Sequence, residues 1–184
     1  MRITGGIYRG RRIICPPGEI RPAMDRMRES LFSILGDISG APFLDLFSGS
    51  GLVGIEAASR SAEPVHLVEL DRQKKVTILQ NIAFVESPIK LFTTDVIKFL
   101  RTAKERYAII YADPPFDYPN KVGLADLVNK RNLLEPNGLF VIHYPAEEGK
   151  LWPNSFATLI FVDERKYGRS KLRFYRQEGK NENS

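Results

Sequence analysis

Between residues 42 and 144 the sequence alternates short apolar runs with longer segments of helical pattern. This alternation is typical of an open α/β fold, in which a helix returns the chain to each new parallel strand. The expected strands are 43–47, 65–70, 89–93, 107–112 and 139–144, and the expected helices are 53–60, 72–85, 96–104 and 121–131. Two later runs, 156–162 and 171–177, have only the short link 166–169 between them, which indicates a hairpin. We therefore predict a doubly wound, mostly parallel seven-stranded sheet with an antiparallel C-terminal hairpin.

The residues before position 42 have different sequence patterns. The alternation of residues 3–14 around Gly5-Gly6 and Gly10 predicts a small β-hairpin, and residues 23–38 have the apolar spacing of a helix. Three organisational segments follow: an appendage at 1–22, a main domain at 23–177 and a polar, frayed tail at 178–184. Within the main domain, we expect Asp71 to cap a helix and Asn137-Gly138 to turn the chain into the fifth strand.

Length and composition narrow the class of protein. A chain of 184 residues that is 43% apolar and 27% charged is ordinary for about one globular domain. One cysteine and two histidines cannot form an internal disulfide or a cluster of zinc ligands, so no metal is expected. The chain shows neither a run of about 18 apolar residues nor an apolar signal region at its start. We expect a soluble, cytoplasmic monomer.

The formal charge of +5 conceals a strong segregation along the chain. Residues 1–28 contain seven arginines and two acids, residues 165–176 contain six basic residues and no acid, and the remainder is net acidic. Local clusters of this kind neutralise phosphates, and the planar arginine fork suits them especially well. A solvated surface would have the same composition. The candidate contacts to a phosphate-bearing partner are Arg9, Arg11, Arg12, Arg21, Arg169 and Lys171.

A glycine-rich turn follows the first expected strand. Gly49-Ser50-Gly51-Leu52-Val53-Gly54 matches G-x-G-x-x-G between a strand and a helix, where a backbone approaches a nucleotide closely. Glu69 ends the second strand, at the position of an acid that accepts hydrogen bonds from ribose hydroxyls. A dinucleotide enzyme, an S-adenosylmethionine enzyme and a plain strand-to-helix turn are all compatible with these features.

Asp45 favours an S-adenosylmethionine enzyme over a dinucleotide enzyme. Its carboxylate lies within the first strand, where it would repel a pyrophosphate but would suit a ligand that carries an ammonium and a sulfonium. Asp95, after the third strand, is equally compatible with an adenine contact and with a helix cap. The predicted cofactor contacts are Asp45, Phe47, Ser48, Gly49, Gly51, Glu69, Leu70, Asp95 and Val96.

The catalytic candidate is Asp113-Pro114-Pro115-Phe116, which follows the fourth strand. An exocyclic amine on a base is a poor nucleophile, because its lone pair is delocalised into the ring. The Asp113 carboxylate and the Pro114 carbonyl can accept its N–H hydrogens, the proline rings keep the loop rigid, and Phe116 offers a stacking face. In-line attack on a sulfonium methyl then needs mainly positioning. A rigid polar loop without chemistry is the alternative.

Over nearly its whole length the sequence resembles the RsmD-type methyltransferases of bacterial 16S rRNA. The shared segments are MRITGGIYRGRRI, RPAMDRMRESLFSIL, LDLFSGSGLVGIEAASR, LVELD, DVIKFL, YADPPF and KYGRSKLRFY. The DPPF and glycine motifs occur in many amino-group methyltransferases, whereas the Arg-Gly opening and RP-x-x-DR-x-RE are narrower. Ala23 stands where the family usually has threonine, Ser61 where it has glycine, and Ala108 where an acid often occurs.

The resemblance implies a Rossmann-like class I methyltransferase that transfers a methyl group from S-adenosylmethionine to the N2 amine of a guanine. The implied partner is 16S rRNA in the small ribosomal subunit or its assembly intermediate. Two rivals remain: another DPPF enzyme acting on DNA adenine, tRNA guanine or protein glutamine, and a non-catalytic RNA-binding module. His66 and His143 fall in strand patterns and are interpreted as structural, while Trp152 and Tyr144 either line a base pocket or pack.

Overall fold

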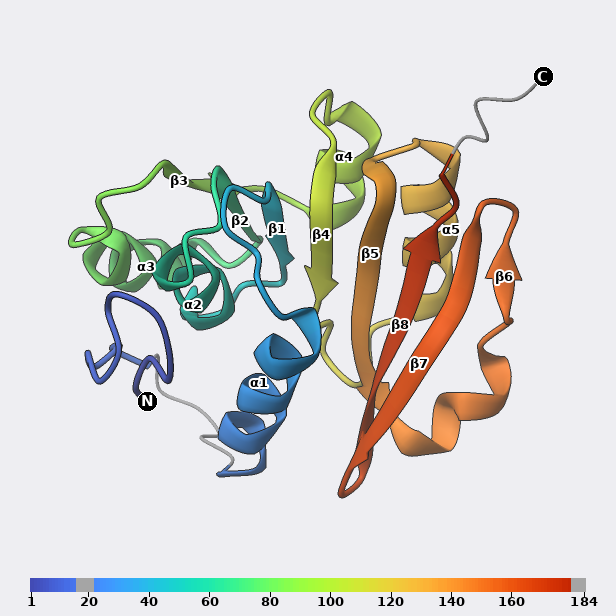
Figure 1. Cartoon of the computed structure of the whole chain (residues 1–184), viewed down its shortest axis with the longest axis horizontal. Coiled ribbons are helices and arrows are strands. Elements are labelled where there is room, and N and C mark those ends of the chain that lie inside the picture. Colours follow the sequence, from blue (N-terminus) through green and yellow to red (C-terminus); the bar gives the residue numbers. More distant parts are fainter. Residues whose placement is uncertain (16–21, 180–184) are drawn as a thin grey trace. The chain divides into compact units, whose positions relative to one another are not determined.

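The computed structural model describes residues 1–15 and 22–179 of the chain, which form two compact units, Met1–Val96 and Ile97–Ser184 (Figure 1). Each unit contains its own strands and helices. The fold class is confirmed, because the chain is an α/β protein with mostly parallel strands and an antiparallel hairpin near its C-terminus.

The first unit is built on three parallel strands in the order β3-β2-β1. Its elements are α1 (Pro22–Leu35), β1 (Phe43–Leu46), α2 (Leu52–Ser59), β2 (Val65–Glu69), the 3₁₀ helix η1 (Arg72–Lys74), α3 (Lys75–Ile82) and β3 (Ile89–Thr93). Every residue of β1 is buried, and α2 packs against β1 and β2. Because parallel strands share a direction, the ends of β1 and β2 lie at one edge of this sheet, where a ligand site is expected.

The second unit has strands in the order β4-β5-β8-β7-β6. Its elements are α4 (Val96–Thr102), β4 (Tyr107–Ala112), α5 (Lys121–Lys130), β5 (Leu134–Pro145), the 3₁₀ helix η2 (Ala146–Leu151), β6 (Ser155–Phe156), β7 (Leu159–Tyr167) and β8 (Ser170–Gln177). Strands β4 and β5 are parallel, whereas β8 is antiparallel to both β5 and β7. The predicted hairpin link is confirmed: β7 ends at Tyr167, and Gly168 turns the chain with φ 58°.

Two strand predictions were wrong. The described residues contain eight strands, because Ala157 adopts φ 51° and divides the run 156–162 into β6 and the start of β7. The fifth strand begins at Leu134, five residues before its predicted start. Asn137 does turn, with φ 64°, but the turn is a bulge inside the strand: Leu134 pairs with Tyr107 and Leu139 with Ile109.

The helices agree closely with their predicted ranges, and the differences have local causes. The first helix ends at Leu35, three residues early, since Gly36 adopts φ 69° and leaves the helical conformation. The segment after β2 begins as the 3₁₀ helix η1, whose first turn is capped as predicted: Asp71 accepts from the Gln73 amide at 2.8 Å. The helix α3 then ends at Ile82 rather than at residue 85.

The predicted N-terminal hairpin is reduced to a single antiparallel bridge between Arg2 and Arg12. Residues 1–15, here called the N-terminal loop, are closed by backbone hydrogen bonds such as Ile3 N to Arg11 O at 3.0 Å. Ile3 and Ile13 are buried and pack with Leu52 and Ile55 of α2. The loop is therefore seated on the first unit by apolar contacts as well as by hydrogen bonds.

Within residues 1–15 and 22–179, no helix is long and apolar enough to cross a membrane. In the same part of the chain, no three His, Cys, Asp or Glu side chains are grouped as metal ligands would be.

Candidate functional site

The glycine-rich turn is held by two carboxylates of the first unit. Glu69 Oε2 accepts from the Gly49 amide at 2.9 Å, and Asp45 Oδ2 accepts from the Gly54 amide at 2.9 Å. Gly49 and Gly51 adopt φ 59° and φ 80°, a backbone conformation that disfavours other residues. The first and third glycines of the motif are thus each held by one of the two predicted cofactor-binding acids.

The third glycine also has a packing role. A Cβ atom at Gly54 would lie 2.1 Å from Leu67 Cδ2 and 3.3 Å from Asp45 Oδ2. Glycine at this position therefore allows α2 to approach β1 and β2 closely, which is the packing role of the last glycine in nucleotide-binding turns. Asp45 itself is only 1% exposed.

The other predicted cofactor residues lie at the same strand ends. Phe47 adopts φ 61°, and the Ser48 amide donates to Val68 O at 3.0 Å, so the chain leaves β1 beside β2. Leu70, after Glu69, is 62% exposed. The Thr94 amide donates to Glu69 O at 3.2 Å, which brings Asp95 and Val96 next to the end of β2. The first unit therefore brings all nine predicted positions to neighbouring strand ends.

This set of groups fits a cationic nucleoside better than a pyrophosphate. Residues 43–54 contain one carboxylate and no lysine or arginine, and Glu69 adds a second carboxylate with its side chain 10% exposed. The basic group near them is Lys74, whose Nζ lies 3.6 Å from Glu69 Oε2. Carboxylates at the ends of strands attract ammonium and sulfonium groups and accept hydrogen bonds from hydroxyl groups.

The catalytic candidate lies in the second unit, directly after β4. Asp113 is partly exposed, Pro114 is buried, and Phe116 is 38% exposed. The Tyr118 amide donates to Pro115 O at 2.9 Å and closes a tight turn. The loop therefore presents a carboxylate and an aromatic face from a constrained backbone, as the sequence predicted.

Lys121 holds the far end of this loop. Its side chain is 4% exposed, and Nζ donates to Phe116 O at 2.6 Å, to Tyr118 O at 3.1 Å and to Glu148 Oε1 at 2.9 Å. A buried ammonium with three acceptors is well compensated and restricts the backbone that it binds. Lys121 is not recognisable from the sequence, because nothing local distinguishes it from a surface residue at a helix start.

His143 contacts the carboxylate proposed for catalysis. Its Nδ1 lies 2.7 Å from Asp113 Oδ1, and its side chain is 7% exposed. The Phe116 ring meets the imidazole edge-on, with centroids 5.5 Å apart. The strand pattern predicts a structural histidine at this position, and His143 does lie within β5. Its contact with Asp113 depends on the pairing of β4 with β5, which residue type alone does not reveal.

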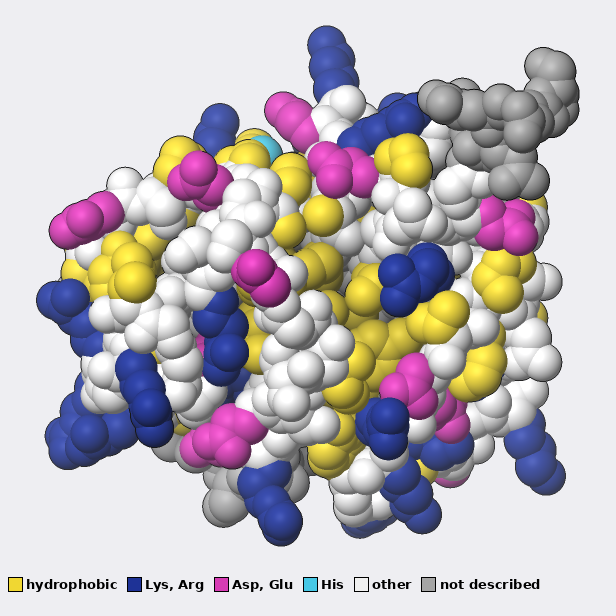
Figure 2. Space-filling model, viewed as in Figure 1, with side chains coloured by type: hydrophobic (Ala, Val, Ile, Leu, Met, Phe, Trp, Pro, Cys, Tyr) yellow, Lys and Arg dark blue, Asp and Glu magenta, His cyan; other side chains and the backbone are white. Residues whose placement is uncertain are grey.

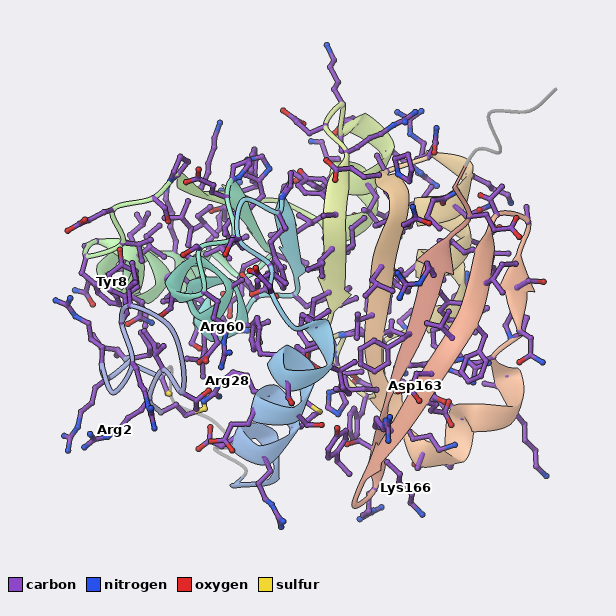
Figure 3. The ribbon with its side chains drawn as sticks, viewed as in Figure 1. Arg2, Tyr8, Arg28, Arg60, Asp163 and Lys166 are labelled. Atoms are coloured by element: carbon purple, nitrogen blue, oxygen red, sulfur yellow. The ribbon has the colours of Figure 1, made fainter. Side chains whose placement is uncertain are left out.

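A second cluster anchors the N-terminal loop to α2 through Glu56, which is completely buried. Its carboxylate accepts from the Thr4 amide and Gly5 amide at 2.8 Å and from Thr4 Oγ1 at 2.6 Å. Arg60 Nη2 lies 3.0 Å and Arg28 Nε 3.4 Å from it. Figure 3 shows Arg28 and Arg60 between the loop and the helices, whereas Arg2 points outward.

Two glycines allow the loop to lie this close to α2. A Cβ atom at Gly6, which adopts φ 76°, would lie 1.8 Å from Ser59 O. The same carbonyl accepts from the Ile7 amide at 2.8 Å, and Ser59 Oγ accepts from the Tyr8 amide at 2.9 Å. Gly6 thus allows the loop to lie against α2, and its carbonyl also begins a turn by accepting from the Arg9 amide at 3.2 Å.

The anchored loop exposes the guanidinium groups of Arg2, Arg9, Arg11 and Arg12. None of the four has an ion pair with a carboxylate in the described part of the chain. Arg11 stacks over the Phe84 ring, 4.0 Å from its centroid, while remaining exposed. Figure 2 shows Lys and Arg side chains protruding around this loop. Arg21, also predicted to contact RNA, lies outside the described residues.

The C-terminal basic segment is less available than its composition suggests. Lys171 donates to Glu164 Oε1 at 2.6 Å, and Arg173 donates to Oε2 of the same residue at 2.8 Å. Burial would raise the pKa of Glu164, but hydrogen bonds from Lys171, Tyr144 and Arg173 outweigh it and lower the pKa to about 2. Arg169, at the hairpin turn, is exposed and has no ion pair within residues 1–15 and 22–179.

The two aromatic residues that the sequence left open are packed. Tyr144 is fully buried and donates to Glu164 Oε2 at 2.5 Å, and Trp152, 6% exposed, lies against it with ring centroids 5.0 Å apart. Ser61, where the resembling family has glycine, adopts φ 66°. The left-handed backbone at this position explains why glycine suits it.

Comparisons with known proteins agree with these features. The model of the family "Conserved hypothetical protein 95" matches residues 1–176. The chain is 34% identical to ribosomal RNA small subunit methyltransferase D of Escherichia coli K12, over 99% of this chain and 92% of that one. The solved structure of yhhF from Escherichia coli is similar, with a TM-score of 0.88 and 31% identity over 98% of this chain and 99% of that one. SMU.776 complexed with SAH shares the fold, with a TM-score of 0.70 and 18% identity over 85% of this chain and 50% of that one.

Proposed function

Because the chain belongs to the Conserved hypothetical protein 95 family, which is the RsmD family, we propose that it methylates the N2 amine of a guanine in 16S rRNA. The enzyme is an S-adenosylmethionine-dependent methyltransferase, and its relatives are named for the RNA of the small ribosomal subunit. The choice of guanine N2 rests on the narrower shared segments at residues 1–13 and 21–29 and on the chemistry of the loop after β4.

The observation that carries the proposal is the placement of Asp113 at the end of β4 on a rigid, partly exposed loop. Its carboxylate accepts one N–H hydrogen of the amine, the Pro114 carbonyl accepts the other, and the nitrogen pyramidalises toward the methyl group. Phe116, with 38% of its surface exposed, stacks on the displaced base. Asp113 then receives the proton that leaves the alkylated nitrogen.

The cofactor residues of the first unit have a separate task. S-adenosylmethionine supplies an electrophilic methyl group on a sulfonium. Glu69 binds the ribose hydroxyls, and Asp45 favours the positive charges of the ammonium and the sulfonium. Leu70 covers the adenine face, and Asp95 either accepts a hydrogen bond from the adenine amine or caps α4. The positive φ values of Gly49 and Gly51 let the glycine turn follow its path past these strand ends. Positioning rather than a metal makes the transfer fast.

Arginines of the N-terminal loop and Arg169 hold the RNA by its phosphates. A folded RNA presents its target base in a loop or bulge and is recognised largely by shape, which a chain of this size can do with two basic patches. We propose that the protein acts as a cytoplasmic monomer on the small subunit or its assembly intermediate. The segment 1–22 is the RNA-binding appendage, and residues 23–177 form the methyltransferase.

Nucleoside mass spectrometry tests the proposed reaction. We expect purified protein and S-adenosylmethionine to add one N2-methylguanosine to 16S rRNA in small subunits from cells that lack the protein. Small subunits from cells that contain it should accept no methyl group. If the methylated product is adenosine, tRNA or a protein, the chain belongs to another class of amino methyltransferase. If no methyl group is transferred to any of these, a non-catalytic RNA-binding module is favoured.

Charge reversal of the N-terminal loop tests its role in RNA binding. We expect Arg9→Glu, Arg11→Glu and Arg12→Glu together to weaken rRNA binding and to reduce the slope of log K against log salt by about one for each phosphate that is no longer neutralised. The matched control reverses Arg101, Lys104 and Arg106, which are exposed in the second unit. Equal slopes for the two triple variants in filter-binding titrations would return the loop arginines to an ordinary solvated surface.

A further inference from the structure

The strongest feature outside the predicted site residues is the contact of His143 with Asp113. Strands β4 and β5 are parallel, and Ala112, the last residue of β4, pairs with Ile142. The residues that follow this pair are Asp113, just after β4, and His143 in β5. Nδ1 and Oδ1 lie 2.7 Å apart, within the range of a strong hydrogen bond to a carboxylate. The contact thus follows from the register of β4 and β5, which brings the first residue of the loop after β4 next to His143.

The contact determines which ring nitrogen carries the proton. A carboxylate is only an acceptor, so the hydrogen between the two groups belongs to His143 Nδ1. The other ring nitrogen, Nε2, is buried and has no hydrogen-bond partner among the described residues. A proton there would leave a buried donor unsatisfied, which is costly. The arrangement therefore favours the Nδ1–H tautomer.

The same imidazole contacts both functional parts of the loop. Nδ1–H occupies Oδ1 of Asp113 and stops the carboxylate from rotating, which leaves Oδ2 for the amine. The ring edge supports Phe116, at 5.5 Å between centroids and an interplanar angle of 62°. Because His143 is 6% exposed and packed in β5, its ring is held in one orientation. It can therefore fix the positions of the Asp113 and Phe116 side chains in the partly exposed loop.

We propose that His143 is a positioning residue for methyl transfer: it orients the Asp113 carboxylate and the Phe116 ring toward the target amine. This inference rests on the proposed function, because it assigns His143 to the group that accepts the amine hydrogen. His143 itself does not contact substrate. Its replacement should therefore lower kcat while leaving the KM for S-adenosylmethionine and for RNA nearly unchanged.

Three variants separate this role from packing. In His143→Asn the amide nitrogen takes the place of Nδ1, in His143→Gln it falls near Nε2, and His143→Leu has no donor. We expect kcat to fall by about tenfold to 100-fold in the Gln and Leu variants, as for a misplaced catalytic group, and by less than about threefold in His143→Asn. Thermal unfolding and SAH titration give the folded fraction of each variant, and kcat is expressed per folded molecule.

Unchanged kcat in His143→Gln would overturn the proposal, and so would an Asn variant as slow as the Gln variant. The comparison of Asn with Gln remains decisive even when the Leu variant does not fold. If the wild-type protein methylates no RNA, the proposed function fails, and ¹⁵N NMR of the imidazole then tests the contact separately. We expect the Nδ1–H tautomer in wild type and its loss in Asp113→Ala, whereas an Nε2–H signal in wild type would contradict the proposed geometry.

Discussion

Replacing Asp113 with alanine lowers the rate of methyl transfer by about 1,000-fold or more, within the range for loss of a positioned proton acceptor. The variant has no carboxylate to accept the amine hydrogen, so the nitrogen lone pair stays delocalised in the base. Affinity for SAH changes little, because Asp45 and Glu69 hold the glycine turn through their own hydrogen bonds. Single-turnover transfer of labelled methyl to small subunits measures the first effect, and calorimetric SAH titration measures the second.

Asp117 supplies the matched control. It lies in the same loop, is exposed, and loses the same charge in Asp117→Ala. We expect that variant to retain nearly full activity. Comparable rates for the two alanine variants would remove Asp113 from the chemistry. Asp113→Asn keeps an oxygen acceptor but loses the negative charge, so its rate should lie between those of alanine and wild type.

Glu56→Ala should destabilise the folded protein by about 3–5 kcal/mol, the usual effect of removing one partner of a buried ion pair. Arg28, whose side chain is 3% exposed, loses a carboxylate at 3.4 Å, and the amides of Thr4 and Gly5 lose their acceptor. Calorimetry should show a decrease in Tm of about 10 °C for a chain of this length. Hydrogen exchange at the Thr4 and Gly5 amides should become fast, because the N-terminal loop is released from α2.

Glu86→Ala is the corresponding control for this prediction. Glu86 is an exposed acid of the same unit, and its substitution should change stability by no more than about 0.5 kcal/mol. Glu56→Ala should also weaken rRNA binding, since the loop arginines would no longer be presented from a fixed backbone. Slow exchange at Thr4 and Gly5 in Glu56→Ala would contradict this role of Glu56 and would leave the apolar contacts of Ile3 and Ile13 and the hydrogen bonds to Ser59 to seat the loop.

The glycine turn illustrates what local sequence predicts well. Its requirements concern the backbone of neighbouring residues: φ values of 59° and 80° at Gly49 and Gly51, and close packing at Gly54. Such requirements limit the residue type directly, so the motif is visible without tertiary information. The same reasoning placed Asp113 at a strand end, because the apolar run 107–112 marks its own boundary.

The C-terminal basic segment illustrates how a count along the chain can mislead. The segment 165–176 has no acid, but its charge is partly neutralised by residues just before it. Glu164 binds Lys171 and Arg173 across the hairpin, and Asp163 lies 2.9 Å from Arg165. Antiparallel pairing brings Glu164 opposite Arg173, nine residues away. Counting charges along residues 165–176 therefore predicts correctly that this segment is basic, but it overestimates how many of its basic side chains are free of ion pairs.

Asn137-Gly138 shows the same limit for secondary structure. The dipeptide is a strong local turn signal, and Asn137 does adopt a left-handed conformation. Whether such a turn ends a strand or becomes a bulge depends on the neighbouring strand. Here β4 continues to pair with β5 on both sides of it, so the turn lies within the strand.

The sequence by itself determined the fold class, the glycine turn, the position of the Asp113 loop after a strand, and the division of charge between acidic body and basic ends. These depend on periodicity, on backbone conformation and on residue type over short stretches of chain. Only the tertiary structure decided that Glu56 anchors the N-terminal loop, that Lys121 and His143 contact the loop after β4, and that Glu164 neutralises part of the basic hairpin. Glu56 binds Thr4 across 52 residues and His143 contacts Asp113 across 30, and helix packing and strand register choose these partners. Residue type alone carries no such information, because a buried and an exposed histidine or lysine have the same letter.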